Sequence, residues 1–144
     1  MTGTPRLLEL TIHAMDGTTI DAPDVASVRA EDSTGSFGIW PGHADFLTAL
    51  DVGVLSYRRT EGPWQYCAVR RGILRVHGGT RVEVATREAV TGTSLQQLER
   101  EVLAVLARRQ AEEDEARREA RRLHAQALLE LVRPRKPTQT EWST

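Results

Sequence analysis

Apolar and polar residues alternate in short runs through the first 90 residues of the chain. Ala26, Val28 and Ala30 are separated by single polar residues, which is the period-2 pattern of a strand with one buried face. Turn signals such as Asp16-Gly17 and Gly35 interrupt the runs, at roughly the 8 to 12 residue spacing typical of a sandwich or barrel. The pattern predicts an all-β domain of about eight short strands and no helix before residue 90.

Two hairpins are predicted in the second half of this domain. The segments Val52 to Arg58 and Trp64 to Arg71 flank Glu61-Gly62-Pro63, where glycine and proline supply the dihedral angles of a tight turn. Bulky residues of the second segment point to both faces, as packed sheets require. Another hairpin is predicted around Gly78-Gly79, because valine alternates with charged residues after that dipeptide.

The pattern changes to a helical period after Gly92. Ser94 is a candidate N-cap with Gln97 three residues later, which approximates a capping box. Arg133 precedes Pro134, and the helical conformation is disfavoured before proline, so the helical region should end there. The apolar residues that recur at spacings of three and four, and so predict an amphipathic helix, are Leu95, Leu98, Val102 and Leu106.

The apolar stripe thins in the middle of this helical region, where most residues are charged. No glycine or proline interrupts residues 94–133, so the sequence allows one long helix or a hairpin that turns near residues 112–115, and we favour two helical segments. The predicted fold class is α+β, in three parts: a β sandwich over residues 1–92, a helical arm over residues 93–133 and a disordered tail over residues 134–144.

Composition is typical of a soluble globular protein. Apolar residues make up 40% of the 144 residues, and no run approaches the roughly 18 consecutive apolar residues of a membrane span. The first residues lack the pattern of a secretory signal, so a cytoplasmic location is expected. The net charge of -1 provides no field to attract a polyanion, which argues against nucleic acid as a partner.

Candidate catalytic chemistry is sparse. Cys67, the single cysteine, sits in an apolar alternation, and no serine stands in a G-x-S-x-G context, so no catalytic residue is predicted. An alternative interpretation is a freestanding small β module or enzyme that binds a metal. Three histidines and an acid could ligate it, although their spacing matches no metal-binding motif: His13, His43, Asp45 and His77. A third interpretation is an adaptor whose arm pairs with another helix.

A long motif resembles a known family. The stretch GSFGIWPGHADFLTAL, residues 35–50, is similar to the pattern G-E-x-G-I-x-P-G-H-A-P-L-x-T-A-L in the epsilon subunit of rotary F-type ATP synthases. The stretch RRGILRVHGGTRVEVATREAVTG, residues 70–92, resembles later strands of the same family. Together with the helical arm, the resemblance covers nearly the whole chain.

At two places the sequence departs from the family pattern, and both departures narrow the resemblance to one branch of the family. Ser36 stands where the family often has glutamate, and Asp45-Phe46 stands where it has proline and an aliphatic residue. These features resemble the alternate, N-type branch, some of whose members are proposed to move sodium ions. Whether the complex carries sodium or protons stays open, because ion choice lies in the ring subunit.

The resemblance implies a sandwich of about ten strands in a non-catalytic subunit of the central stalk. Such a subunit joins the gamma subunit to the membrane c-ring, so this one is expected at the inner face of the cell membrane without inserting into it. His43 and Asp45 are then expected beside gamma, and Ser36 and its neighbours beside the ring. The complete set of implied interface residues is Ser36, Phe37, Trp40, His43 and Asp45.

For the arm, the resemblance implies contacts to the catalytic alpha and beta subunits that slow ATP hydrolysis. Whether the arm inhibits in this protein stays open. Some members bind ATP through I-D-x-x-R-A, but residues 113–118 keep only its aspartate and arginine, so no nucleotide or other cofactor is predicted. Trp142, in the tail, is a candidate docking residue. The candidate arm contacts are Arg117, Arg118, Arg121 and Arg122.

Overall fold

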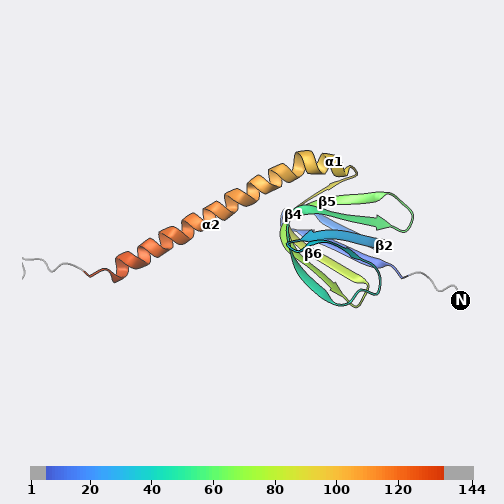
Figure 1. Ribbon diagram of the computed structural model, residues 1–144, viewed down its shortest axis with the longest axis horizontal. Helices are drawn as coiled ribbons and strands as arrows, with labels where there is room; N and C mark the ends of the chain where they lie inside the picture. Colours follow the sequence, from blue (N-terminus) through green and yellow to red (C-terminus); the bar gives the residue numbers. More distant parts are fainter. Residues whose placement is uncertain (1–5, 135–144) are drawn as a thin grey trace, which may run out of the picture. The chain divides into compact units, whose positions relative to one another are not determined.

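The computed structural model describes residues 6–134 (Figure 1). Compact packing divides the chain into two units, with the boundary between Gln110 and Ala111. The first unit holds all six strands of the described part of the chain and the beginning of the helical region. The strands are β1 (Leu8–Ala14), β2 (Thr19–Asp32), β3 (Gly35–Ile39), β4 (Phe46–Arg59), β5 (Trp64–His77) and β6 (Arg81–Gly92).

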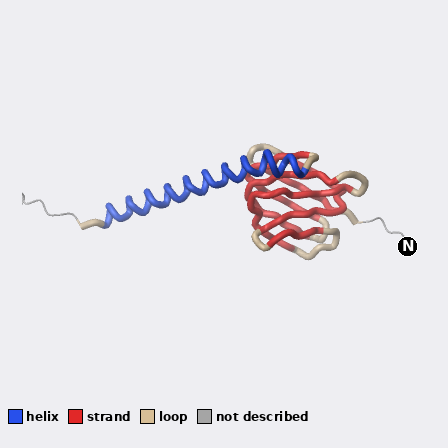
Figure 2. The backbone as a smooth tube through the Cα atoms, turned by 45° about the horizontal axis from the view of Figure 1, so that its top comes forward, coloured by secondary structure: helices blue, strands red, loops and turns tan. Residues whose placement is uncertain are grey.

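The strands form one sheet that closes on itself. Their order is β1-β6-β5-β4-β2-β3, and β1 pairs in parallel with β6 and antiparallel with β2. The β1–β2 pairing therefore closes the ring β1-β6-β5-β4-β2, which leaves β3 as the edge strand beside β2. Figure 2 shows the strands curving around one another. The predicted β sandwich is confirmed, in a closed and barrel-like form.

The core lies between the curved parts of this sheet and follows the alternation of the sequence. In β1, the leucine and isoleucine positions are fully buried while Glu9 and His13 are exposed. In β5, Cys67 and Val69 face the core, as the alternation predicts. The largest fully buried side chains of this core are Leu8, Leu10, Ile12, Ile39, Leu55 and Leu74.

The strands are fewer and longer than the sequence predicts. Three strands contain 14 residues each, so six strands replace the expected ten. In β5, Arg71 has φ 55° and Gly72 has φ 156°, yet pairing to β4 continues in the same register on both sides. Such left-handed residues kink a strand without ending it. A glycine that was expected to end a strand can therefore lie at a kink within one long strand, so one long strand replaces two predicted short strands.

Both predicted hairpins are present. The β4 and β5 strands pair up to Arg58 and Trp64 around the Glu61-Gly62-Pro63 turn. The β5 and β6 strands are joined through Gly78 and Gly79, whose φ values are 66° and 75°. Two successive positive φ values are typical of the tight turns that match strand twist, and glycine adopts them without strain.

The helical region begins where the sequence places it. It consists of α1 (Leu95–Gln97), a π-helical turn η1 (Leu98–Val102) and α2 (Leu103–Val132). The Ser94 side chain accepts a hydrogen bond from the backbone N–H of Gln97, which confirms the N-cap. We call residues 95–110, which belong to the compact β unit, the arm root.

The preference for two helical segments is wrong, because α2 continues without a turn through residues 112–115. Arg117 lies 3.3 Å from Glu113, and Arg122 lies 2.6 Å from Glu119. Ion pairs at these spacings, with no glycine or proline nearby, favour continued helix. No helix of the described residues is long and apolar enough to cross a membrane. Most of the predicted tail, including Trp142, lies outside the described residues.

Candidate functional site

The loop between β3 and β4 is fastened to the β5–β6 turn. The backbone N–H of Gly42 donates to the Gly79 carbonyl oxygen at 2.7 Å, and the Asp45 carboxylate accepts from the Gly78 N–H at 3.2 Å. The two loops are in contact here, since a Cβ on Gly79 would stand 3.4 Å from the Gly42 backbone, and the φ of 75° at Gly79 favours glycine. The motif PGHAD therefore has a structural role, which fixes one loop against another.

His43 belongs to the same loop. Its backbone N–H donates to the Trp40 carbonyl oxygen at 3.2 Å, and its ring nitrogen Nδ1 donates to the Ala44 carbonyl oxygen at 2.7 Å. Its ring meets the Phe46 ring edge-on at 5.8 Å, and Phe46 in turn meets Phe37 at 5.4 Å. These contacts orient the histidine, whose side chain is half-buried.

The turn between β2 and β3 is held by Asp32. Its carboxylate accepts hydrogen bonds from the Thr34 hydroxyl and N–H at 2.5 and 2.8 Å and from the Thr48 hydroxyl at 2.6 Å. These bonds, chiefly those from the Thr34 and Thr48 hydroxyls, hold the pKa of Asp32 below its usual range. The turn thus presents the neighbouring Ser36 from a fixed backbone.

An apolar face lies on the outside of the sheet. Leu47 of β4 and Ile73 of β5 are 67% and 53% exposed, although both belong to regular strands. They line a hollow of about 640 Å³ with residues of β1 and β6 such as His13 and Arg81. Leu47 also lines a second hollow with Asp45. We call this surface, around Leu47 and Ile73 and reaching Asp45, the outer face.

The four candidate metal ligands do not converge. His77 Nε2 lies 3.2 Å from the Glu83 carboxylate, and this hydrogen bond is the main reason that the pKa of Glu83 is lowered. Asp45 is engaged by Gly78 and His43 by Ala44, while His13 lies on the exposed side of β1. No three metal-ligating side chains of the described residues gather at one point. The geometry therefore gives the metal-binding alternative no support.

The remaining predicted interface residues line a groove. Ser36, Phe37 and Trp40 form one side of a space of about 490 Å³, and Trp40 is 57% exposed. The Trp40 ring lies over Gly38, where an added Cβ would stand 2.8 Å from it. Residues of the arm root form part of the opposite side. The five predicted interface residues are thus divided between this groove and the loop fastened at Gly79.

Apolar packing fixes the arm root to the sheet. Leu98 and Leu106 are buried against Ala68 of β5, and the half-buried residues of this cluster are Val52, Val54, Tyr66, Val102 and Leu103. Leu98 also contacts Gly92, where a Cβ would stand 3.1 Å from its side chain. The first part of the amphipathic stripe is therefore satisfied within the β unit.

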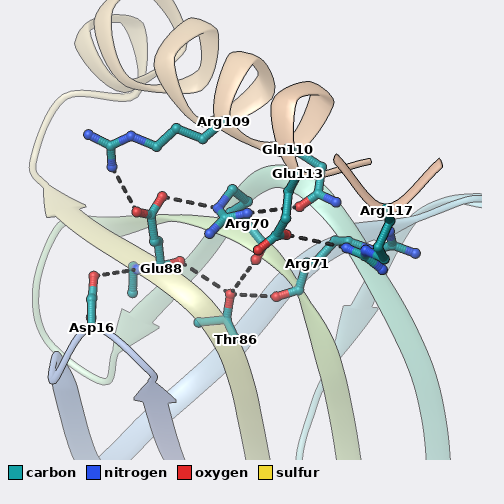
Figure 3. Close-up of polar contacts among 10 residues, drawn as sticks. Asp16, Arg70, Arg71, Thr86, Glu88, Arg109, Gln110, Glu113 and Arg117 are labelled. Atoms are coloured by element: carbon teal, nitrogen blue, oxygen red, sulfur yellow. Dashed lines mark hydrogen bonds and ion pairs between the residues drawn. The ribbon is translucent and has the colours of Figure 1, made fainter. Parts of the chain in front are cut away.

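A polar cluster, which we call the clamp, adds to this packing. It consists of Arg70, Glu88, Arg109 and Gln110 (Figure 3). Arg70 and Glu88 are directly opposed on β5 and β6 and lie 3.1 Å apart. The other Glu88 oxygen receives Arg109 at 2.7 Å, and Arg70 donates to Gln110 at 3.1 Å. Both side chains of the opposed pair are mostly buried, so the ion pair is poorly screened.

The kink in β5 lies next to the clamp, and Thr86 of β6 holds its backbone. The Thr86 hydroxyl lies 2.6 Å from the Arg71 carbonyl oxygen and 3.1 Å from the Arg70 carbonyl oxygen (Figure 3). Gly72 is required there, because a Cβ would stand 1.9 Å from the Ala85 carbonyl oxygen. The clamp was not predicted from the sequence, because its members are separated by up to 40 residues. Its one sequence signal was an arginine within an otherwise apolar strand.

Three of the four predicted arm arginines have partners within their own helix. Arg117 pairs with Glu113, Arg118 lies 3.6 Å from Glu115 and Arg122 lies 2.6 Å from Glu119. Arg121 has no ion pair within the described residues. It is consequently the cation of this group that can pair with an external carboxylate without breaking an existing contact.

Cys67 is inert in this setting. Burial raises the pKa of its thiol to about 12, so the reactive thiolate is absent at neutral pH. Its sulfur lies in the core beneath β5. The buried cysteine is a small packing residue, as its place in the alternation predicts.

The chain thus combines a closed β domain that exposes aliphatic side chains on its outer face with a helical arm. The family model described as "ATP synthase, Delta/Epsilon chain, beta-sandwich domain" matches residues 7–92. The chain belongs to this family of ATP synthase epsilon chains, which are non-catalytic subunits of the complex.

Relatives extend the similarity beyond the β domain. The chain is 49% identical to ATP synthase epsilon chain 2 of Cereibacter sphaeroides, over 79% of this chain and 78% of that one. It is 44% identical to ATP synthase epsilon chain 2 of Paraburkholderia xenovorans, over 91% and 94%. Both relatives are named as second epsilon chains, in agreement with the alternate branch that the sequence motifs indicate.

Solved structures share the fold. One chain of the Euglena gracilis mitochondrial ATP synthase, in a structure of OSCP, F1 and the c-ring, superposes with a TM-score of 0.58 at 24% identity, over 77% of this chain and 66% of that chain. A chain in the central stalk and c-ring of the Tetrahymena thermophila mitochondrial ATP synthase superposes with a TM-score of 0.51 at 17% identity, over 60% of this chain and 69% of that chain. At these identities the likeness supports the fold alone.

Proposed function

We propose that this chain is the central-stalk subunit that couples gamma to the c-ring in a rotary ATP synthase or ATPase. The observation that carries the proposal is the outer face, because Leu47 and Ile73 expose aliphatic surface on otherwise regular strands. Burial of such surface is the main driving force for lasting protein association. Its position within the complex would place the chain at the inner face of the cell membrane.

Gamma is the proposed partner of the outer face. The face combines aliphatic centres with charged residues at its border, which is the usual arrangement of a specific interface. Asp45 lines the hollow next to it, so the fastened loop with His43 extends the same surface. His43 and Asp45 are then positioning residues at the edge of the gamma contact.

The c-ring is the proposed partner of the β2–β3 turn and its surroundings. Ser36 is exposed beside a turn that Asp32 fastens, and Phe37 and Trp40 follow on the same strand and loop. A turn held by hydrogen bonds suits a joint that transmits torque, because a turn that deformed under load would not pass the torque on.

The proposed role of the arm is regulation of ATP hydrolysis through the alpha and beta subunits. Arg121 is the arm cation without an internal partner, and Arg117, Arg118 and Arg122 would exchange their present partners on binding. Exposed leucines follow these arginines, at 54% for Leu123 and 67% for Leu129. An apolar and basic surface of this kind fits an acidic segment of a catalytic subunit.

Binding to gamma tests the central proposal. The full chain is mixed with the gamma subunit of the same host, and the complex is followed by size-exclusion chromatography with light scattering. A stable one-to-one complex is expected, and Leu47→Lys should weaken it at least about tenfold by placing a charge in the apolar contact. Leu129→Lys is the matched control, because both leucines are 67% exposed. Failure of the wild-type chain to bind any gamma subunit of the host would refute the stalk role.

A further inference from the structure

Two arginines and a tryptophan form a cluster on three neighbouring strands. Arg58 of β4 is directly opposite Trp64 of β5, and its guanidinium carbon lies 5.5 Å from the centroid of the Trp64 ring. The guanidinium carbon of Arg29, on β2, lies 5.8 Å from the same centroid. Arg29 is paired with Ser56, two residues before Arg58 on β4, so the two arginines occupy neighbouring rows of the sheet. We call Arg29, Arg58 and Trp64 the arginine–tryptophan cluster.

Neither arginine of the cluster has an acidic partner. Arg29 and Arg58 are exposed and form no ion pair within residues 6–134, the part of the chain that the structure describes. The next arginine, Arg59, lies 3.4 Å from Asp24, so that carboxylate is already paired. Glu31 lies beyond Arg29 on β2, on the side away from Arg58. The aromatic ring thus holds two like charges together, and an anion that contacts both would offset their repulsion.

The stacked geometry determines which anion fits. A guanidinium that stacks on an aromatic ring uses its face, so the N–H groups in its plane stay free to donate. Each arginine can therefore form a bidentate pair with two oxygens of a ligand. A carboxylate has only enough oxygens for one such pair, whereas a phosphate group has enough for both. Ser56, which lines the same groove as Arg29, adds a hydroxyl donor beside them.

We propose that the arginine–tryptophan cluster binds a phosphate group, supplied by inorganic phosphate in solution or by the headgroup of an anionic lipid. Both sources present the same oxygens to the two guanidiniums, and the experiment separates them. The site goes beyond the proposed stalk function and does not depend on it, because all its residues belong to the compact β unit of a single chain.

The first probe is inorganic phosphate. The full-length chain, labelled with nitrogen-15, is titrated with phosphate at constant ionic strength, because added salt alone would screen the arginines. The side-chain N–H signals of Arg29, Arg58 and Trp64 should shift together and saturate. Arg58→Gln should bind phosphate at least about tenfold more weakly. Arg58→Lys keeps the charge but loses the planar fork, so it should lose most of the affinity as well.

The matched control is Arg75→Gln. It removes the same charge from an exposed arginine on the outer face and should bind phosphate like wild type. Circular dichroism confirms that each variant is folded.

The second probe is a vesicle of phosphatidylcholine with or without phosphatidylglycerol. Binding of the chain to the phosphatidylglycerol vesicles only, lost in Arg58→Gln and kept in Arg75→Gln, with no saturable shift in free phosphate, would assign the site to a lipid headgroup. Saturation by free phosphate would assign it to the solution ligand. The proposal would be overturned by the absence of binding to both probes, by equal losses in Arg58→Gln and Arg75→Gln, or by wild-type affinity in Arg58→Lys.

Discussion

At the scale of single residues, this protein depends on backbone conformation at a few positions. Gly72 combines φ 156° with an approach that leaves no room for a Cβ, since that atom would stand 1.9 Å from the Ala85 carbonyl oxygen. Arg71 precedes it with φ 55°. The kink that these two residues make lets one strand continue while it changes direction, and it places Arg70 in the clamp.

Gly72→Ala should destabilise the fold by more than about 2 kcal/mol, because alanine has a clash with backbone atoms and a strained dihedral angle there. Urea unfolding followed by circular dichroism measures the loss. Gly62→Ala is the control, since a Cβ at Gly62 meets nothing within 4 Å. Equal stability of the two variants would contradict the assigned role of the kink.

Asp32 should make stability depend on pH in the acid range. Hydrogen bonds lower the pKa of its carboxyl in the folded state, so its contribution is present above the unfolded pKa of about 4 and is lost as pH falls through the lower folded pKa. The Tm of wild type should therefore fall more between neutral pH and about pH 3 than the Tm of Asp32→Asn. Parallel curves for the two proteins would show that the turn does not depend on this charge.

At the scale of elements, α2 is one helix with two different surroundings. Up to Gln110 it shares the packing of the β unit, through buried Leu106 and the clamp. From Ala111 onward its side chains are mostly exposed, and the helix is stabilised by pairs such as Arg122 with Glu119. Pairs of this type contribute only about 0.2 to 0.5 kcal/mol each. Stability is therefore expected to fall along the helix beyond residue 110.

Leu106→Ala should cost about 2 to 5 kcal/mol of packing in the arm root, because the leucine is 1% exposed and leaves a cavity. The expected readout is faster hydrogen exchange in residues 95–110 with little change in the strands. Val105→Ala serves as the comparison, since Val105 is 38% exposed. Equal exchange in both variants would mean that the root is held by the clamp alone.

At the scale of the whole molecule, the chain combines a closed β domain with an arm of a different composition. The family match over residues 7–92 and the relatives at 49% and 44% identity make the chain an epsilon chain of ATP synthase. The predicted boundaries at residues 92 and 133 stay a prediction. The strands end at Gly92, and compact packing continues to Gln110, so the arm root contributes to the β unit.

Deletion of residues 111–144 should raise ATP hydrolysis by the assembled complex about fivefold or more, if the arm contributes a coupling energy of the usual size. Steady-state ATPase activity of the complex measures it. Arg121→Ala should reproduce part of the increase, and Arg118→Ala less of it, because Arg118 already pairs with Glu115. Unchanged hydrolysis after the deletion would exclude an inhibitory arm.

The sequence by itself determined the features that depend on neighbours along the chain. Alternation placed the strands, glycine pairs placed the turns, and Ser94 with the three-and-four spacing placed the helix start, all through local backbone preference. The motif around His43 and Asp45 was sufficient for the family. It also gave candidate interface residues, whose contacts with partners stay a prediction.

Tertiary structure decided what depends on residues far apart in sequence. Closure of the sheet through β1, the joining of Arg70, Glu88 and Arg109, and the exposure of Leu47 all follow from strand register and packing. Tertiary structure also decided between one long helix and a helical hairpin. A hairpin would bury the apolar stripe of one segment against the other, whereas a single helix needs another surface for its stripe. Here the first part of that stripe is buried on the sheet, and the apolar residues of the remainder are exposed.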